Sequence, residues 1–313
     1  MGTDIVEVKD LSKVFGKGPQ RIEAVSAVNL QVHEGEILGV VGESGCGKST
    51  LGKLILHLLK PSAGRIIFRG QDITDASYSE LRIIRKNMQM IFQGSSNAFN
   101  PFLTVRQILN EPLSNYPECV KNSVNDQIEK ALEEVGLNSD YLDRYSRELS
   151  GGQRQRIGIA RALILDPKFV VCDEAVSSID YALKNQVLRI LYRLKQEHSS
   201  TYLFISHDIE AVRAICDRVA VMYLGNLVEL LPDIHEESVH PYTKALLSAA
   251  LPTDPSQRHN RKLMFKENND KERCMKGCPF QNRCLYAEGR CFEDRPDMKE
   301  VGPGHFVACH LYT

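Results

Sequence analysis

The sequence predicts an α/β fold in which helices cover a mostly parallel β-sheet. Up to about residue 223, short apolar strand patterns alternate with helix patterns, as in chains built from strand–helix–strand units. A glycine-rich loop joins one fully apolar strand pattern to a helix pattern, a connection typical of such sheets. The chain has 313 residues, enough for one large domain followed by a smaller one.

The first elements are predominantly strands. Residues 5–15 and 24–42 have β-branched or alternating apolar patterns, which predict an antiparallel β subdomain at the N-terminus. A helix with an apolar stripe follows over residues 47–59 and is closed by KPSAG. Residues 64–73 resemble a strand, and residues 79–93 run from a helix into an apolar strand.

The second half of the core contains a helical insert and then further strands. Residues 104–148 show helical patterning without β-branched runs. Residues 154–176 predict a helix, a turn and a buried strand, and residues 201–208 predict another strand. A helix over 209–217 and a strand over 218–223 complete the alternation, which a parallel sheet explains.

The composition excludes several classes of protein. The 39 basic residues balance 40 acidic ones, so nothing indicates a nucleic-acid partner. The N-terminal stretch MGTDIVEVKD lacks the apolar core of a signal peptide, and no run reaches about 18 apolar residues. We therefore expect a cytoplasmic chain that does not span a membrane, in which clustered cysteines are more often metal ligands than disulfides.

The segment VVGESGCGKST matches the Walker A loop of P-loop NTPases, which predicts a RecA-like core. Its glycines let backbone N–H groups point at phosphate oxygens, Lys48 reaches the β- and γ-phosphates, and the Ser49 hydroxyl would hold Mg²⁺. A chance match is the alternative, and the strand before the loop and the helix after it count against this. The predicted ATP-binding residues of the loop are Gly42, Glu43, Ser44, Gly45, Cys46, Gly47, Lys48, Ser49 and Thr50.

An acidic pair follows the apolar strand FVVCDE. Asp173 suits a role near Mg²⁺, and Glu174 suits polarisation of the attacking water. A helix-capping acid pair is the alternative, which the presence of the Walker A loop makes less favoured.

The segment LSGGQRQR, residues 149–156, resembles the signature motif of ABC-type ATPases. Gln93 in MIFQ matches the Q-loop of that family, Ser178 to Asp180 match its D-loop, and His207 in FISHD matches its switch histidine. Phe15 falls where the family places an aromatic ring on adenine. The resemblance covers about residues 5–230.

The resemblance implies roles for these residues. The signature residues, which begin a helix, would contact ATP held by the P-loop of a second subunit, so that two chains sandwich each nucleotide. His207 would act at the γ-phosphate together with Glu174, and Gln93 would ligate Mg²⁺ or the water. The family's commonest form after the catalytic acid is EPTSxLD, whereas this chain has EAVSSID, a form found among peptide and nickel importers. The signature residues are Ser150, Gly151, Gly152 and Gln153, and the D-loop residue is Asp180.

The C-terminal segments HPYTKALLSAALP and GCPFQNRC resemble the extension of ATPase subunits from oligopeptide, dipeptide and nickel importers. The resemblance implies a nucleotide-binding domain over residues 1–235, with a helical subdomain at about 95–160, and an extension over 236–313. It further implies an ATPase that drives uptake of peptides or a related solute, including nickel or a metal chelate. A soluble ABC ATPase of DNA repair or iron–sulfur assembly and a non-hydrolysing regulatory subunit are the alternatives.

Four cysteines of the extension match positions of the family, namely Cys278, Cys284, Cys291 and Cys309, while Cys274 is a spare. Four thiolates can bind zinc or a four-iron cluster. The irregular spacing and the resemblance favour a [4Fe-4S] cluster over Zn²⁺, with unligated thiols as a third reading. The metal would pin an extension too short to bury a core alone.

The resemblance also implies the partners. We expect a second ABC ATPase subunit in a heterodimer, two membrane permease subunits, and an extracytoplasmic solute-binding protein that acts through the permeases. The chain would lie peripherally at the cytoplasmic face of the cell membrane.

Overall fold

A computed structural model describes residues 3–92, 99–176, 181–249 and 276–312. Within these ranges an eight-stranded sheet has the order β11-β12-β10-β9-β3-β8-β7-β6, and the strands from β9 to β6 pair in parallel. Every residue of β3, β7 and β8 is buried, because other elements cover both faces of the sheet. The predicted α/β fold is confirmed. The parallel strands are β3 (Ile37–Val41), β6 (Met88–Ile91), β7 (Phe169–Asp173), β8 (Thr201–Ile205) and β9 (Arg218–Tyr223).

The N-terminal strands form a second, antiparallel sheet with the order β2-β1-β4-β5. Helix α1 (Lys48–Ile55) packs between the two sheets, since it contacts β1 and β2 on one side and β7 and β8 on the other. Its buried leucine and isoleucine side chains join the apolar cluster that both sheets share. The four strands are β1 (Asp4–Phe15), β2 (Ile22–His33), β4 (Ala63–Phe68) and β5 (Gln71–Asp72).

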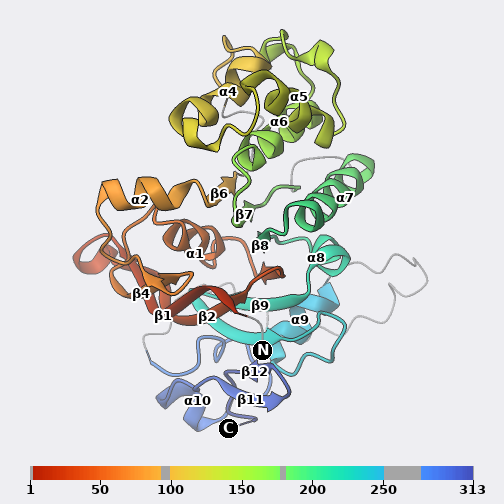
Figure 1. Cartoon of the computed structure of the whole chain (residues 1–313). Helices are drawn as coiled ribbons and strands as arrows, with labels where there is room; N and C mark the ends of the chain where they lie inside the picture. Colours follow the sequence, from red (N-terminus) through yellow and green to blue (C-terminus); the bar gives the residue numbers. More distant parts are fainter. Residues whose placement is uncertain (1–2, 93–98, 177–180, 250–275, 313) are drawn as a thin grey trace.

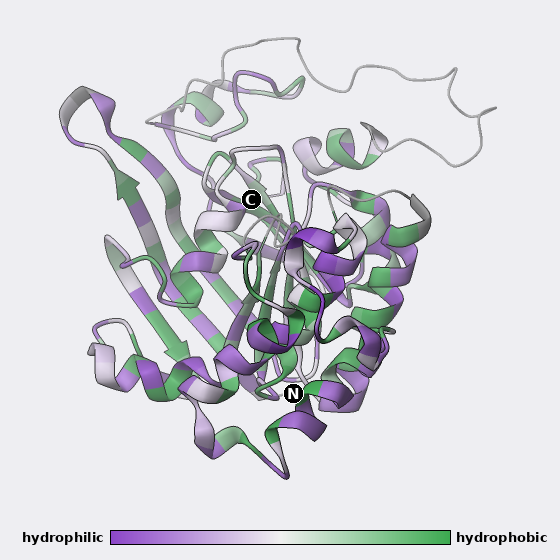
Figure 2. Ribbon diagram, turned by 90° about the horizontal axis from the view of Figure 1, so that it is seen from above, coloured by the Kyte–Doolittle hydropathy of each residue, from purple (hydrophilic) through white to green (hydrophobic). Residues whose placement is uncertain are grey.

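Three helices form a lobe at the top of Figure 1, where α4 and α5 pack on α6. Helices α2, α7 and α8 lie closer to the central sheet, and Figure 2 shows hydrophobic residues gathered on the strands that these helices surround. None of the helices in the described ranges has the length and apolar character that a membrane span requires. The helices are α2 (Tyr78–Arg85), α4 (Val105–Asn115), α5 (Val124–Glu134), α6 (Gly151–Leu163), α7 (Tyr181–His198) and α8 (Ile209–Ile215), with short 3₁₀ turns at Gly18–Gln20, Pro117–Cys119, Ser139–Tyr141 and Ser146–Glu148.

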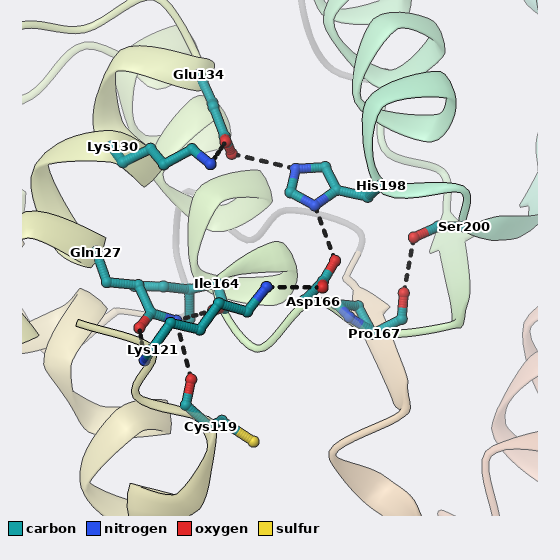
Figure 3. Close-up of polar contacts among 10 residues, drawn as sticks. All are labelled: Cys119, Lys121, Gln127, Lys130, Glu134, Ile164, Asp166, Pro167, His198 and Ser200. Carbon is teal, nitrogen blue, oxygen red and sulfur yellow. Dashed lines mark hydrogen bonds and ion pairs between the residues drawn. The ribbon is translucent and has the colours of Figure 1, made fainter.

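A charged cluster joins the helical lobe to the core (Figure 3). His198 at the end of α7 lies between two carboxylates, with Nδ1 at 2.9 Å from Asp166 Oδ1 and Nε2 at 3.3 Å from Glu134 Oε2. Lys121 and Lys130 pair with the same carboxylates. The hydrogen bond with Glu134, followed by the contact with Asp166, raises the pKa of His198 against the opposing effect of burial.

The C-terminal extension continues the main sheet instead of forming a separate core. Strand β12 pairs with β10 (Asn226–Leu231), and β11 pairs with β12. Phe280, Cys278 and Cys284 belong to the same apolar cluster as the central strands. Strand pairing and shared packing therefore attach the extension to the central sheet. Its elements are α9 (Pro241–Ala249), α10 (Gly289–Glu293), β11 (Lys299–Gly302) and β12 (His305–Val307).

A buried carboxylate fastens the extension to β10. Glu229 is fully buried and accepts hydrogen bonds from the backbone N–H groups of Val239 and His240. Its Oε1 also lies 2.9 Å from Nε2 of His305 in β12. Val239, His240 and His305 all lie beyond β10, so these contacts help to specify how the extension docks.

Candidate active site

The loop after β3 has a backbone that only glycine permits at two positions. Gly42 has φ 151° and Gly47 has φ 110°, a region that L residues rarely adopt. A Cβ on Gly42 would lie 2.2 Å from the Met222 carbonyl oxygen, and one on Gly47 would lie 2.2 Å from the Ala24 carbonyl oxygen. The loop therefore turns tightly against β9 and β2 before it enters α1.

Lys48 begins α1 and lies under the loop. Lys48 is 4% exposed, and its ammonium group donates hydrogen bonds to the carbonyl oxygens of Gly42 at 2.8 Å and Glu43 at 3.0 Å. No side chain caps α1, so a helix N-terminus and a cation converge where a phosphate would bind. Ser44 and Gly45 lie exposed at the loop tip. Cys46 is buried, and burial raises the pKa of its thiol, which agrees with a packing role.

The structure brings Ser49 and Asp173 together. The Ser49 hydroxyl donates to Asp173 Oδ1 at 2.6 Å, which links the start of α1 to the end of β7. Burial raises the pKa of Asp173, and the hydrogen bond from Ser49 opposes this effect. Hydroxyl and carboxylate oxygens are ligands that Mg²⁺ prefers. Gln93, the third predicted ligand, lies outside the described residues.

The predicted catalytic acid faces the predicted switch histidine. Glu174 Oε1 lies 3.3 Å from Nδ1 of His207, at the edge where β7 and β8 end. Glu174 adopts φ 48°, an unusual value for a residue with a side chain, and its N–H donates to the Ile205 carbonyl. Such backbone outliers occur often at functional sites. The acid is mostly buried, whereas the imidazole is half exposed, so a ligand could reach both.

Phe15 ends β1 with its ring 40% exposed. It pairs with Ile22 of β2, and two residues farther along β2 is Ala24, whose carbonyl contacts Gly47. Phe15 therefore lies on the strand pair beside the phosphate loop, with Lys13 Nζ 5.3 Å from its ring centroid, and enough of the residue is exposed for an adenine ring to contact it.

The signature residues occupy the N-terminus of α6 in the helical lobe, whereas α1 lies in the lower lobe of Figure 1. Ser150 Oγ accepts the N–H of Gln153, and Gln153 Oε1 accepts the N–H of Ser150, a reciprocal capping box. Gly151 is exposed with open space around it, and a Cβ on Gly152 would meet a Leu183 methyl group at 2.1 Å.

The unusual segment after the predicted catalytic acid is well packed. Ala175 and Val176 are buried, and the side-chain amide of Gln155 in α6 donates to the Ala175 carbonyl at 2.8 Å. Small apolar residues therefore suit this position between the two lobes. Asp180 and Ser178 of the D-loop lie outside the described residues.

Two contacts of the extension with the phosphate loop were not predicted. The backbone N–H of Glu43 donates to the Tyr242 hydroxyl at 2.9 Å. Arg283 donates from Nη1 to both carboxylate oxygens of Glu43, at 2.9 and 3.1 Å. The segment that contains Tyr242 was interpreted only through its resemblance to the family, which does not indicate this contact. No local sequence pattern indicates which loop Arg283 contacts.

The four predicted cysteines come from separate segments, and their thiols lie close enough to influence one another electrostatically. The Cys278 N–H donates to the Cys291 carbonyl at 2.7 Å. Burial raises the pKa of the Cys278 thiol to about 12, and the nearby thiols of Cys309, Cys291 and Cys284 add to this effect. In the described ranges no cysteine forms a disulfide, and no three His, Cys, Asp or Glu side chains are grouped so that they could hold a metal ion. Cys274 lies outside these ranges.

The comparisons with known proteins agree with this geometry. Residues 25–177 match the family model described as ABC transporter. The dimeric structure of the ATP-binding cassette MJ0796, bound to ADP and Pi after hydrolysis, matches 71% of this chain and 96% of its own at 29% identity, with a TM-score of 0.65. CbiO1 from Clostridium perfringens matches 74% of this chain and 89% of its own at 27% identity, also with a TM-score of 0.65. Fold and site thus define an ABC-type ATPase cassette.

The C-terminal residues narrow the assignment. Residues 228–291 match the model described as oligopeptide/dipeptide transporter, C-terminal region. The oligopeptide transport ATP-binding protein AppF of Bacillus subtilis is 43% identical, with 99% of this chain and 98% of AppF covered. OppF of Salmonella typhimurium is 41% identical, with 97% and 92% covered. The chain belongs to the family of ATP-binding subunits of oligopeptide ABC transporters, and it hydrolyses ATP to drive transport.

Proposed function

We propose that this chain powers the import of oligopeptides or dipeptides from the cytoplasmic face of the cell membrane. The observation that carries the proposal is the convergence of the Walker A loop with Asp173, Glu174 and His207 at one edge of the sheet. The names of AppF and OppF and the matched C-terminal region support a peptide as cargo. Nickel or a metal chelate is the second candidate cargo.

Each residue has a chemical role in this proposal. The helix N-terminus and Lys48 hold the β- and γ-phosphates, which carry the negative charge that this region attracts. Ser49 and Asp173 would hold Mg²⁺ together with Gln93, and the ion neutralises charge on the phosphates when bound. Glu174 accepts a proton from the attacking water, and His207 keeps the water and the acid in line with the γ-phosphate.

We propose further that two ATPase subunits assemble head to tail. The signature helix α6 and the phosphate loop lie in different lobes of one chain, so each ATP would be contacted by the loop of one subunit and the signature of the other. The partner would be a second, distinct ATPase subunit. This arrangement gives Ser150 and the glycines after it a phosphate to bind.

The membrane partner would dock between the helical lobe and the core. A groove of about 550 Å³ lies there, lined by apolar residues such as Leu103 and Ile108, with Glu111 and Arg161 also in its lining. Phe92, which also lines the groove, directly precedes Gln93. A short helix of a permease subunit would fit this amphipathic groove, and its movement would be linked to the nucleotide site through Gln93.

We propose that Cys278, Cys284, Cys291 and Cys309 bind a [4Fe-4S] cluster. The proximity of the four thiols, which influence one another's charge, supports this proposal, since cysteine thiolates hold such clusters. Iron and acid-labile sulfide would be measured in protein purified without oxygen. Stoichiometric zinc without visible absorbance would contradict the cluster.

Transport in cells tests the proposed function directly. A strain that lacks this chain should fail to take up a labelled tripeptide, and the wild-type chain should restore uptake while Glu174→Gln should not. Uptake of labelled nickel, measured in the same strains, is the comparison. Restoration of nickel uptake alone would contradict a peptide cargo.

A further inference from the structure

We propose that Tyr242 and Arg283 of the C-terminal extension are positioning residues that hold the Walker A loop in its ATP-binding conformation. Both contact Glu43, the residue after the first glycine of that loop. The inference rests on the proposed phosphate-binding role of the loop and assigns the extension a part in ATP binding. It does not depend on whether the cysteines carry a metal.

Tyr242 fixes the backbone of the loop. Its side chain is almost fully buried, and its hydroxyl accepts the N–H of Glu43 at 2.9 Å. Burial raises the pKa of this hydroxyl, so the group stays neutral at physiological pH. The ring is held by Tyr223 at 4.6 Å and Phe280 at 5.4 Å between ring centroids. Since Phe280 belongs to the extension, the extension determines where this hydroxyl lies.

Arg283 neutralises the negative charge that Glu43 brings to the loop. The Glu43 carboxylate is an anion in a segment that must bind a polyphosphate, and like charges at such distances repel. Arg283 donates to both carboxylate oxygens, and its side chain is only 14% exposed, which limits screening by water. Its guanidinium lies 5.8 Å from the ring centroids of both Tyr223 and Phe280, so the aromatic cluster fixes its position.

Loss of the Arg283 charge and simple destabilisation of the fold should have different effects on ATP binding. Arg283→Gln leaves the Glu43 carboxylate uncompensated, so ATP affinity should fall about tenfold. Adding Glu43→Gln removes the unpaired anion, so the double variant should regain most of the affinity. Damage to the fold would instead grow, or stay the same, when a second substitution is added.

Arg295 offers a matched control. It also joins the extension to the core, because Nη1 donates to the Ser26 hydroxyl at 2.9 Å, but its partner is on β2 and not in the phosphate loop. Arg295→Gln should therefore leave ATP affinity unchanged. Tyr242→Phe keeps the buried ring and removes only the hydroxyl, so affinity should fall by about three- to tenfold.

The experiment is a titration of the full-length chain with a fluorescent ATP analogue, with thermal unfolding recorded for every variant. The inference is supported if Arg283→Gln weakens binding, Arg283→Lys retains more affinity than Arg283→Gln, and Glu43→Gln rescues the loss. It is overturned if Arg283→Gln binds like the wild type, or if the double variant binds no better than the single one. A wild-type chain that binds no more tightly than Lys48→Ala would instead refute the proposed phosphate site itself.

Discussion

The first turns of α1 and α6 are built differently, although both are proposed to bind a phosphate of ATP. Helix α1 starts at Gly47 without a side-chain cap, and Lys48 supplies a cation at its first position. Helix α6 starts at Ser150, whose side chain forms a capping box with Gln153, and its first three residues carry no charge. Uncapped N–H groups beside a cation form a strong anion site, whereas a capped, uncharged helix end forms a weak one.

This difference indicates the order in which the two sites would contact ATP. The α1 site can bind nucleotide in a single chain, because loop, helix end and cation come from one continuous segment. The α6 site adds few donors, and none of its first three residues is a cation, so we expect it to gain a ligand only when ATP is already held by another subunit. Lys48→Ala and Ser150→Ala test this division, whereas Glu174→Gln tests the proposed catalytic acid and His198→Gln tests the junction between the lobes.

Glu174→Gln should lower the rate of ATP hydrolysis by about 100- to 10,000-fold and leave ATP affinity near the wild-type value. The glutamine keeps the shape of the acid but cannot accept the proton of the attacking water. Phosphate release under single-turnover conditions, together with nucleotide titration, checks both halves of the expectation. Hydrolysis within a few-fold of the wild-type rate would remove Glu174 from the mechanism.

Lys48→Ala should weaken ATP binding by about 100-fold, because the cation of the α1 site and its charged hydrogen bonds to phosphate are lost. Equilibrium titration of the isolated chain measures this effect. A change in ATP affinity of less than about threefold would contradict the expectation that the α1 site binds ATP in a single chain.

Ser150→Ala should leave the ATP affinity of the isolated chain unaltered and reduce hydrolysis in the assembled transporter by about 10- to 100-fold, the value of one donor to a phosphate. Loss of the helix cap should also lower the free energy of unfolding by about 1 kcal/mol. Chemical denaturation and the ATPase rate of the complex give the two numbers. A drop in the affinity of the isolated chain would break the division between the sites.

His198→Gln should have the smallest effect, which is a pH-dependent loss of folding stability. The pKa of His198 is raised above the ordinary value of 6.5 by Glu134 and Asp166. The stabilisation is therefore complete below about pH 6.5 and is lost as pH rises through the folded-state pKa. Chemical denaturation of the wild type and of His198→Gln at pH 6 and pH 9 measures the free energy of unfolding. The two proteins should differ more in this free energy at pH 6 than at pH 9. An equal difference in the free energy of unfolding at both pH values would mean that protonation of His198 does not stabilise this junction between the lobes.

The sequence predicted the parts of the site that depend on local patterns and on parallel-sheet geometry. Walker A is one continuous segment, so its residue types and spacing indicate its chemistry directly. Glu174 and His207 follow separate strands, yet parallel strands end at the same edge of a sheet, and the two side chains lie 3.3 Å apart there. Roles that depend on a second subunit, such as those of Ser150 and Asp180, stay predictions.

The contacts of the extension could not be predicted in this way. Arg283 meets Glu43 across 240 positions of sequence, and Tyr242 meets the same residue across 199. Such pairs depend on how β12 docks on β10 and how Phe280 packs into the core, and neither is a local property. Similarly, the resemblance named the four cysteines, whereas the burial of Cys278 and Cys284 within the shared core emerged only from the fold.

The most direct test of the account is the ATP-dependent association of two ATPase subunits. The mass of Glu174→Gln would be measured by analytical ultracentrifugation with and without Mg²⁺ and ATP, alone and mixed with the second ATPase subunit of the transporter. The account predicts a pair of subunits that forms only with ATP and does not form when Lys48→Ala is added to this chain. Subunits that stay separate at saturating ATP, both when Glu174→Gln is alone and when it is mixed with the second subunit, would contradict the claim that the α1 and α6 sites are completed across two chains.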